Sequence, residues 1–197
     1  AIDSGVESVG ISGATGTPSP ARSTTAQCRT ASNSPPLARS RMHYDREAHK
    51  SRTNGERQRD HEGFRLRSAG VCVRGEGAEM RLLLVSGGKD GERWVVPGGG
   101  IEKGEAAEAA AVRELVEEAG VRAETAEMIG VFQDDNRKHR TRVFVMLERE
   151  EMAEWDDGRF GRRRCWMPII EALSKVKESH VAILRTVMDH YRIPQPS

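Results

Sequence analysis

From residue 64 onward, apolar and polar positions follow a pattern that predicts short strands leading into a helix. Three short apolar runs separated by glycine turns predict the first strands: Val71–Val73 with its flanks, Met80–Ser86 and Arg93–Val96. Pro97 and the glycines after it interrupt regular structure. Apolar positions then recur at helical spacing, which predicts a helix over roughly Gly104–Ala119 with Gly120 as its cap.

The second half of the chain continues to switch between strand and helix patterns. Further strands are expected near Met128–Gln133, Thr141–Glu148 and Arg164–Met167. Pro168 suits the first turn of a helix, and two C-terminal helices are expected over Ile169–Lys175 and Ser179–Tyr191. This order of elements predicts the α/β class, with a mixed β-sheet sandwiched between α-helices.

The N-terminal segment differs from the rest in composition. Residues 1–41 are rich in Ser, Thr, Gly and Pro and contain no aromatic residue, so they cannot bury enough apolar surface to offset the entropy of ordering. Residues 43–62 are strongly charged. We therefore expect residues 1–62 to be a disordered or mobile extension and residues 63–194 to form the domain. Because the chain begins at Ala1, Met42 is a candidate natural start, and residues 1–41 need not belong to the native protein.

Composition narrows the compartment and the class of partner. The formal net charge is +1, so no global field favours nucleic acid or a membrane surface. No apolar run reaches the length of a membrane span, and no secretion signal is recognisable, so we expect the cytoplasm, with nuclear entry open to so small a domain. Cys28, Cys72 and Cys165 form no metal-ligand pattern and no disulfide framework. Reduced thiols are expected, with Cys72 and Cys165 in the core.

The predicted helix carries three carboxylates on one arc. Glu114, Glu117 and Glu118 have the spacing i, i+3, i+4, which places them on one side of a helix. The opposite arc is apolar and can pack on a core: Ala109, Val112, Leu115, Val116 and Ala119. Three like charges on one arc need neutralisation, and Mg²⁺ with oxygen ligands would supply it. The alternative is a solvated acidic helix face.

The spacing around these carboxylates is that of a known motif. The fixed positions are Gly99, Glu105, Arg113, Glu114, Leu115, Glu117, Glu118, Gly120 and Val121, and they resemble the Nudix box. The resemblance implies the Nudix fold and a hydrolase that splits a diphosphate linkage with Mg²⁺ or Mn²⁺. It also implies that Glu114 and Glu118 are metal ligands and that Glu105 and Arg113 form a structural ion pair. Glu117 lies beside the ligand pair and is the candidate general base, although some family members place the base outside the box.

Other segments resemble one subfamily more closely. They are Arg93-Trp-Val-Val-Pro-Gly-Gly-Gly-Ile-Glu, Gly130-Val-Phe-Gln, Arg137-Lys-His-Arg-Thr, Trp155-Asp-Asp and Gly161-Arg-Arg-Arg-Cys-Trp. Together they resemble the diphosphoinositol polyphosphate phosphohydrolases, over roughly Arg57 to Leu184. The resemblance implies removal of the β-phosphate from inositol pyrophosphates and cleavage of diadenosine polyphosphates.

Basic residues come in short blocks that suit so anionic a substrate. The resemblance implies substrate contacts at Arg57, Arg65, Arg67, Lys89, Gly98, Gly99, Arg137, Lys138, His139 and Arg162. Gly98 and Gly99 would let the backbone approach a phosphate or metal, or would serve simply as a tight turn. The chain departs from the subfamily pattern at Gly87 and Gly88, at Leu66 and near His180, where a lysine is usual. The Gly158–Gly161 loop is one residue short.

Two alternatives stay open at this point. One is a Nudix hydrolase of another nucleoside diphosphate derivative, of capped RNA or of inorganic polyphosphate; scarce aromatic residues argue against base stacking. The other is a non-catalytic polyanion-binding module, which the intact carboxylates argue against. The expected partner is a small polyanionic substrate, with no nucleic acid and no membrane. The sequence leaves the oligomeric state open, and we expect a monomer.

Overall fold

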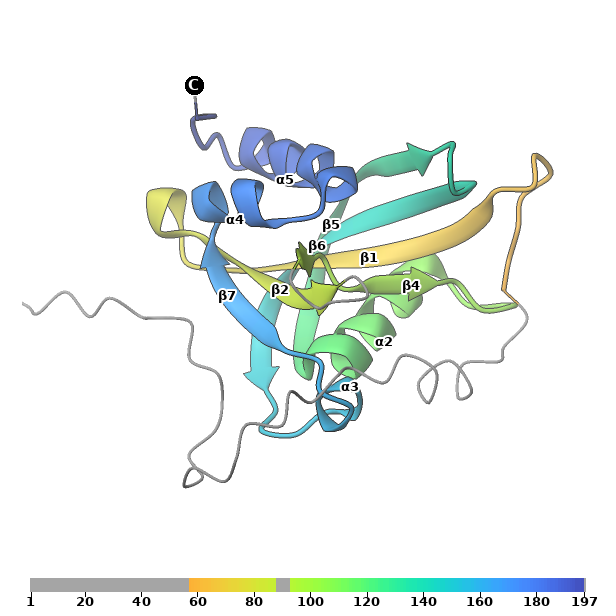
Figure 1. The fold of residues 1–197 in the computed structure, drawn as a ribbon, viewed down its shortest axis with the longest axis horizontal. Helices are drawn as coiled ribbons and strands as arrows, with labels where there is room; N and C mark the ends of the chain where they lie inside the picture. The colour runs from red at the N-terminus through yellow and green to blue at the C-terminus, as the bar shows by residue number, and fades with distance from the viewer. Residues whose placement is uncertain (1–56, 88–92, 197) are drawn as a thin grey trace, which may run out of the picture.

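The computed structural model describes residues 57–87 and 93–196, and a seven-stranded mixed sheet runs through them (Figure 1). The strands are β1 (Arg65–Arg74), β2 (Arg81–Gly87), β3 (Arg93–Val95), β4 (Gly98–Gly100), β5 (Val121–Asp134), β6 (His139–Glu151) and β7 (Arg164–Pro168). The main path is β3-β2-β1-β6-β5, while β4 pairs with β1 and β7 pairs with β2. Strands β1 and β6 run parallel, and the other pairs are antiparallel.

Helices cover both faces of this sheet, which confirms the predicted architecture. Helix α2 (Ala107–Ala119) lies on one face, and α4 (Ile169–Lys175) and α5 (Glu178–His190) lie on the other (Figure 1). A 3-10 turn, η1 (Gly77–Glu79), joins β1 to β2, and the short helix α3 (Asp156–Arg159) precedes β7. Within the described residues, none of these helices is both long and apolar enough to cross a membrane.

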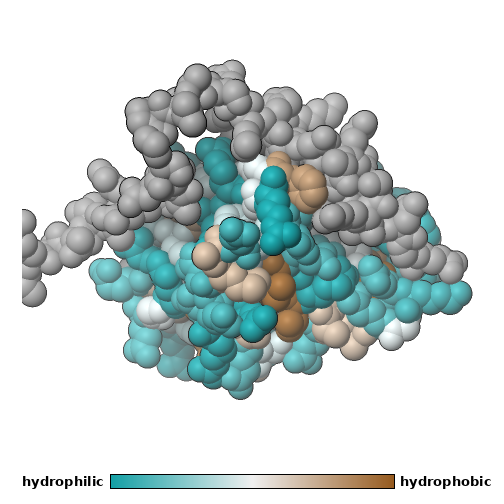
Figure 2. All heavy atoms as spheres, turned by 90° about the horizontal axis from the view of Figure 1, so that it is seen from below, coloured by the Kyte–Doolittle hydropathy of each residue, from teal (hydrophilic) through white to brown (hydrophobic). Residues whose placement is uncertain are grey.

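The core consists of two layers, one on each face of the sheet. Leu82 and Leu84 of β2 belong to the layer beneath α4 and α5, whereas Leu83 and Val85 belong to the layer beneath α2. A strand buried on both faces needs apolar residues at successive positions, which explains the continuous apolar run at Met80–Ser86. Seen from below the view of Figure 1, the surface is mainly hydrophilic, with hydrophobic side chains gathered near its middle (Figure 2).

Several element boundaries differ from the predictions. The helix begins at Ala107 rather than Gly104, because Gly104 has a φ of 79° and forms a turn. At its other end Gly120 has the predicted left-handed conformation, with φ 62° and ψ 37°. The long strands β5 and β6 extend well past their predicted cores at Met128–Gln133 and Thr141–Glu148. The prediction that the glycine run Gly98–Gly100 interrupts regular structure is wrong, since these residues pair with Arg67–Ala69 of β1 as strand β4.

Two other predictions concern the cysteines and the N-terminal region. Cys72 is a buried free thiol, and burial raises its pKa to about 12, which fits the predicted core role. Cys165 is also buried, which fits its predicted core role. Residues 57–62, which we assigned to the extension, contact the domain. The backbone of Arg57 forms an isolated β-bridge with Glu102, and that of Arg59 forms one with Arg65. The expectations for residues 1–56 lie outside the described residues.

Candidate active site

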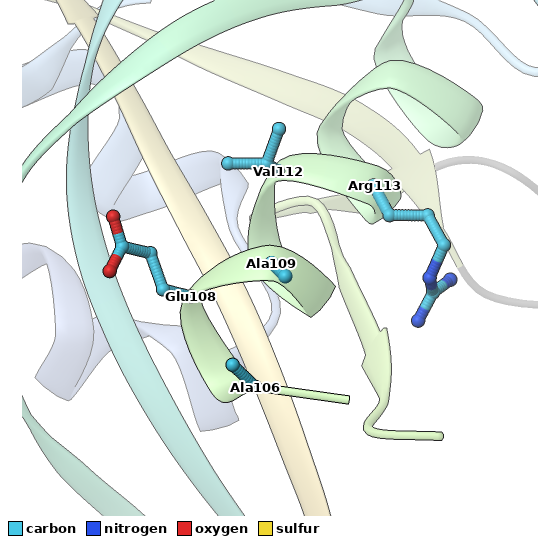
Figure 3. Close-up of a pocket in the computed structure, with 5 residues that line it drawn as sticks. All are labelled: Ala106, Glu108, Ala109, Val112 and Arg113. Carbon is cyan, nitrogen blue, oxygen red and sulfur yellow. The ribbon is translucent and has the colours of Figure 1, made fainter. Parts of the chain in front are cut away.

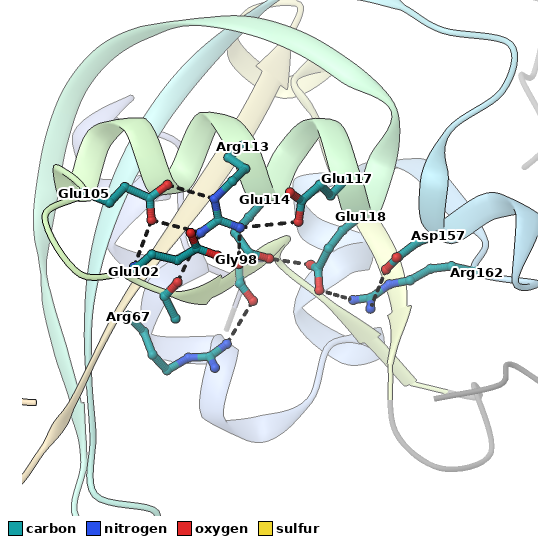
Figure 4. Close-up of polar contacts among 11 residues, drawn as sticks. Arg67, Gly98, Glu102, Glu105, Arg113, Glu114, Glu117, Glu118, Asp157 and Arg162 are labelled. Atoms are coloured by element: carbon teal, nitrogen blue, oxygen red, sulfur yellow. Dashed lines mark hydrogen bonds and ion pairs between the residues drawn. The ribbon is translucent and has the colours of Figure 1, made fainter. Parts of the chain in front are cut away.

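Helix α2 presents its carboxylates toward strand β4, which is the neighbour of β1 in the sheet (Figure 4). The buried residues of α2 are Ala110, Ala111, Leu115, Glu118 and Ala119. The predicted apolar stripe is therefore only partly right: Leu115 and Ala119 are buried, but Ala109 is exposed. Glu118 is only 8% exposed, so the carboxylate arc does not simply lie opposite the buried arc, as the spacing had predicted. A carboxylate can be buried here because protein groups replace its water.

Both oxygens of Glu118 have such partners. The backbone N–H of Gly98 donates to Oε2 at 2.9 Å. The guanidinium of Arg162 lies 3.0 Å from Oε1, and its other terminal nitrogen lies 3.3 Å from the carboxylate of Asp157. Asp157 is fully buried, at 0% exposure. The predicted substrate ligand Arg162 thus stands at the edge of the carboxylate cluster, within a buried chain of alternating charges.

The glycines of β4 allow the helix to approach the sheet this closely. A Cβ atom at Gly99 would lie 1.9 Å from a carboxylate oxygen of Glu114, so this carboxylate would have to move. A Cβ atom at Gly98 would lie 2.6 Å from the Cβ atom of Ala69 in β1. Close packing against Glu114 and Ala69 therefore explains glycine at these two positions, while the predicted approach to a phosphate or metal stays a prediction.

Arg113 holds the other carboxylates of the helix. Its guanidinium binds both oxygens of Glu105, at 2.8 and 3.0 Å, which is the predicted ion pair. The same guanidinium donates to Glu114 at 3.0 Å, to Glu117 at 3.3 Å and to the carbonyl of Gly100 at 3.1 Å. Arg113 therefore fixes the loop before α2, strand β4 and two box carboxylates in one arrangement (Figure 4).

Burial and charge set the protonation behaviour of this cluster. Burial, followed by the charge of Glu118, raises the pKa of Glu114. Burial also raises the pKa of Glu118, against the opposing effects of Arg162 and the Gly98 N–H. In contrast, the hydrogen bond with Arg113 lowers the pKa of Glu105. The two carboxylates nearest β4 are thus the ones for which added positive charge would be most favourable.

A basic group of side chains borders the same strand from the β1 and β6 side. The guanidinium of Arg67 donates to the carbonyl of Gly98 at 2.8 Å. Parallel register places Arg65 beside His139 and Arg67 beside Thr141. Arg57 and Arg65 both lie against Gly100, where an added Cβ would be 3.0 Å and 3.1 Å from their side chains. Strand β4 therefore separates an acidic side, on α2, from a basic side.

Like charges on the basic side influence one another. Burial lowers the pKa of Arg67 and, with the charge of Arg67 as the next cause, the pKa of His139. The charge of Arg137 also lowers the pKa of His139. The Arg137 side chain forms a partly exposed ion pair with Asp134 at 3.4 Å. The ammonium of Lys138 lies over the ring of Phe64, 4.7 Å from its centre. Lys89 lies outside the described residues.

The structure adds one residue that the sequence did not assign to the site. His180 of α5 accepts a hydrogen bond at Nδ1 from the Val96 N–H, at 3.3 Å. Burial and, after it, the charges of Arg67, Lys177 and Arg137 together lower its pKa to about 4. The only signal in the sequence was the loose match to a subfamily lysine near this position. The contact between His180 and Val96, which lies between β3 and β4, comes from tertiary packing.

The donors available for a metal can be compared with the prediction. Among residues 57–87 and 93–196, no group of three or more His, Cys, Asp or Glu side chains is arranged as a metal-holding cluster. Glu114 and Glu118 still supply an oxygen-only pair whose charges raise the free energy of the ionised state. Such a pair suits a hard divalent cation that takes its remaining oxygens from water and phosphate.

A shallow hollow lies along the first turns of α2 (Figure 3). Ala106, Glu108, Ala109, Val112 and Arg113 line it. Figure 3 shows the Glu108 carboxylate and the Arg113 guanidinium pointing to opposite sides of the helix. Its mostly apolar lining makes it unsuited to a polyanion, so the polar groups around β4 remain the candidate active site.

Comparisons with known proteins agree with this geometry. The NUDIX domain model matches residues 64–190. Diphosphoinositol polyphosphate phosphohydrolase 3-alpha of Mus musculus is 45% identical over 133 residues, which cover 66% of this chain and 80% of that protein. Diphosphoinositol polyphosphate phosphohydrolase 2 of Homo sapiens is 42% identical over 132 residues, which cover 66% and 72%.

A solved structure supports the fold independently. A protein described as a nudix hydrolase family member from Chromobacterium violaceum superposes with a TM-score of 0.50 at 17% identity, over 64% of this chain and 77% of that one. At this identity the likeness bears on the fold alone. The domain match over residues 64–190, which is more than half of the chain, shows that this chain belongs to the Nudix family.

Proposed function

We propose that this protein hydrolyses diphosphoinositol polyphosphates, removing the β-phosphate as inorganic phosphate. One observation carries the proposal: a buried carboxylate pair on α2 and a group of mutually repelling cations meet across strand β4. A diphosphate on a heavily phosphorylated ring needs both, because the diphosphate requires charge neutralisation and the ring phosphates require many cationic donors. Relatives 42% and 45% identical carry this activity in their names.

Glu114 and Glu118 would hold a divalent cation, Mg²⁺ or Mn²⁺. When bound, this cation would neutralise phosphate charge and polarise the scissile linkage. Gly98 and Gly99 leave room for a phosphate group beside the carboxylates, since they have no side chains. Glu105 and Arg113 take no part in the chemistry under this proposal; their ion pair holds the loop and helix in place.

Glu117 is the proposed general base. It is 29% exposed, in contrast to the buried Glu118, so solvent can reach it. Glu117 would take a proton from a water molecule whose oxygen attacks the β-phosphorus. The bond from that phosphorus to the bridging oxygen breaks, and its electron pair leaves with the inositol phosphate. Arg113, 3.3 Å from Glu117, keeps this carboxylate close to Glu114.

The proposed substrate contacts lie on the basic side. Arg65, Arg67 and His139 lie close together on adjoining strands, and Arg57 approaches from the preceding segment. Guanidinium groups can bind phosphate oxygens in pairs, which suits an array of equatorial phosphates. Further contacts are proposed for Lys89, Arg137, Lys138 and Arg162. Diadenosine polyphosphates are proposed as secondary substrates because they present the same diphosphate chain.

To test this proposal, the full chain is incubated with Mg²⁺ and one of three substrates in parallel. The substrates are a diphosphoinositol pentakisphosphate, a diadenosine polyphosphate and ADP-ribose. We expect preferred release of inorganic phosphate and inositol hexakisphosphate from the first substrate. Preferred cleavage of a nucleotide would overturn the proposed substrate class. Glu117→Gln should lower kcat by about 100- to 10,000-fold, the usual range for a lost general base. Glu108→Gln is the matched control, because Glu108 is exposed on the same helix and should keep wild-type kcat.

A further inference from the structure

A buried chain of three charged residues links α2 to the loop before β7. Glu118, Arg162 and Asp157 alternate in charge, with contacts of 3.0 Å and 3.3 Å (Figure 4). The side chains of Arg162 and Glu118 are only 10% and 11% exposed, and that of Asp157 is 0% exposed. Ion pairs shielded from water in this way are held much more firmly than surface pairs.

Asp157 fixes Arg162 through its backbone as well as its side chain. The N–H groups of Phe160 and Arg162 both donate to the carbonyl of Asp157, each at 3.0 Å. This tight turn places the Arg162 side chain between two carboxylates, Asp157 and Glu118. The guanidinium can therefore give up one carboxylate while keeping the other.

Both carboxylate oxygens of Glu118 already have protein partners. One of its oxygens accepts the Gly98 N–H of strand β4, and the other faces Arg162. The first contact is built into the sheet, because Gly98 is paired with Ala69 of β1. A cation that takes an oxygen of Glu118 must therefore compete chiefly with Arg162.

We propose that Arg162 and the divalent cation compete for Glu118, and that Asp157 is a positioning residue that holds Arg162 when it leaves. This inference rests on the proposed function, in which Glu118 is a metal ligand and Arg162 a phosphate ligand. A phosphate group that draws Arg162 away from Glu118 frees that carboxylate for the cation. Cation and phosphate then strengthen each other's binding, and the two effects must be equal by linkage.

The competition predicts opposite signs for two substitutions. Arg162→Gln removes the competitor and should raise the affinity for Mn²⁺ by about tenfold, within the usual range of coupling between sites. Asp157→Asn removes the second partner of Arg162, so the guanidinium should stay on Glu118 and Mn²⁺ should bind more weakly. A purely structural role would weaken Mn²⁺ binding in both variants.

A general charge effect must be separated from competition for one oxygen. Arg67 provides the matched control, since it also acts electrostatically on Glu118 but donates to the Gly98 carbonyl instead. Arg67→Gln removes the same charge and should raise Mn²⁺ affinity much less than Arg162→Gln. Equal increases would overturn the proposal. Arg159→Gln, in an exposed pair with Glu154, should leave Mn²⁺ affinity unchanged.

The experiment titrates Mn²⁺ into the full-length chain and follows free Mn²⁺ by electron paramagnetic resonance, with and without sulfate as a weakly chelating phosphate mimic. A protein-free titration corrects for the sulfate. Sulfate should raise Mn²⁺ affinity in the wild type and much less in Arg162→Gln; no difference between them would overturn the proposal. If Arg162→Gln fails to fold, Arg162→Lys should show a smaller increase in Mn²⁺ affinity, since lysine lacks the fork.

Substrate hydrolysis is assayed separately on the same proteins. The expected Mn²⁺ pattern without cleavage of a diphosphoinositol substrate would overturn the proposed function alone. Cleavage of that substrate with unchanged Mn²⁺ affinity in the Arg162 and Asp157 variants would overturn the competition alone.

Discussion

The acidic and basic sides of the candidate site treat their charges in opposite ways. On the acidic side each box carboxylate has an arginine nearby: Arg113 contacts Glu114 and Glu117, and Arg162 contacts Glu118. On the basic side, neighbouring cations oppose one another, since Arg67 lowers the pKa of both His139 and His180 after burial has done so. Each of these carboxylates thus contacts a cation within the protein, whereas the two histidines of the basic side face further cations.

This difference predicts that arginines on the two sides affect different properties. An arginine that neutralises carboxylates should matter for stability even without substrate. An arginine among like charges should matter little for stability and much for substrate affinity, because the substrate supplies its missing counter-charge. Substitution of one arginine on each side tests the contrast.

The largest effect is expected from Arg113→Gln. This change removes the partner of Glu105 and leaves Glu114 and Glu117 close together without their shared cation. Breaking a buried pair costs about 3–5 kcal/mol, and because Arg113 is 24% exposed we expect the lower end. Urea unfolding in the absence of divalent cations measures this free energy.

Arg122→Gln is the control for that measurement. Arg122 pairs with Glu150 at 3.1 Å, but the two side chains are 64% and 56% exposed. Such surface pairs contribute about 0–1 kcal/mol. If Arg113→Gln lost no more unfolding free energy than Arg122→Gln, the acidic side would not depend on its internal arginine.

The next effect is a change of substrate affinity for Arg67→Gln. Burial lowers the pKa of Arg67 and outweighs the opposing charges of Glu118 and Glu114, so on balance its charged form is not strongly stabilised in the free protein. We expect the unfolding free energy to change by less than about 1 kcal/mol, while KM for a diphosphoinositol substrate rises by about tenfold or more, as for a lost charged hydrogen bond. A large loss of stability with unchanged KM would show that Arg67 belongs with the acidic side.

Distance along the chain explains what could be predicted from the sequence. Glu105 and Arg113 lie eight positions apart within one motif, and the resemblance of that motif to the Nudix box implied their contact. Local patterns also predicted the end of helix α2, the order of strands and helices, and the C-terminal helix at Ile169–Lys175. These features depend on chemistry that is close in the chain.

Other features depend on groups that only the fold brings together. Glu118 is buried because Arg162, 44 positions later in the chain, and the Gly98 N–H reach it. The run Gly98–Gly100 reads as a turn in sequence, yet β1 turns it into a strand. His180 meets Val96 across 84 positions. Helical periodicity could not place these contacts, since it describes one element at a time.

The smallest effect we predict is a pH dependence of stability due to His180. Its pKa falls from 6.5 to about 4 on folding, so below pH 6.5 the unfolded chain binds a proton that the native protein does not. The contribution of His180 to the unfolding free energy is therefore fully present above pH 6.5. It is lost as the pH falls from 6.5 toward 4. Because the ring is partly exposed, we expect a loss of about 1–2 kcal/mol over this window, less than the full shift would imply.

Urea unfolding from pH 7.5 to pH 4 measures this dependence. His180→Gln should flatten the curve, because glutamine can still accept the Val96 N–H but does not titrate. A polyanion bound on the basic side would favour protonation of His180, so inositol hexakisphosphate should reduce the loss of stability at low pH. If the ligand left the His180-dependent slope unchanged, the positive potential at His180 would not be part of the substrate site.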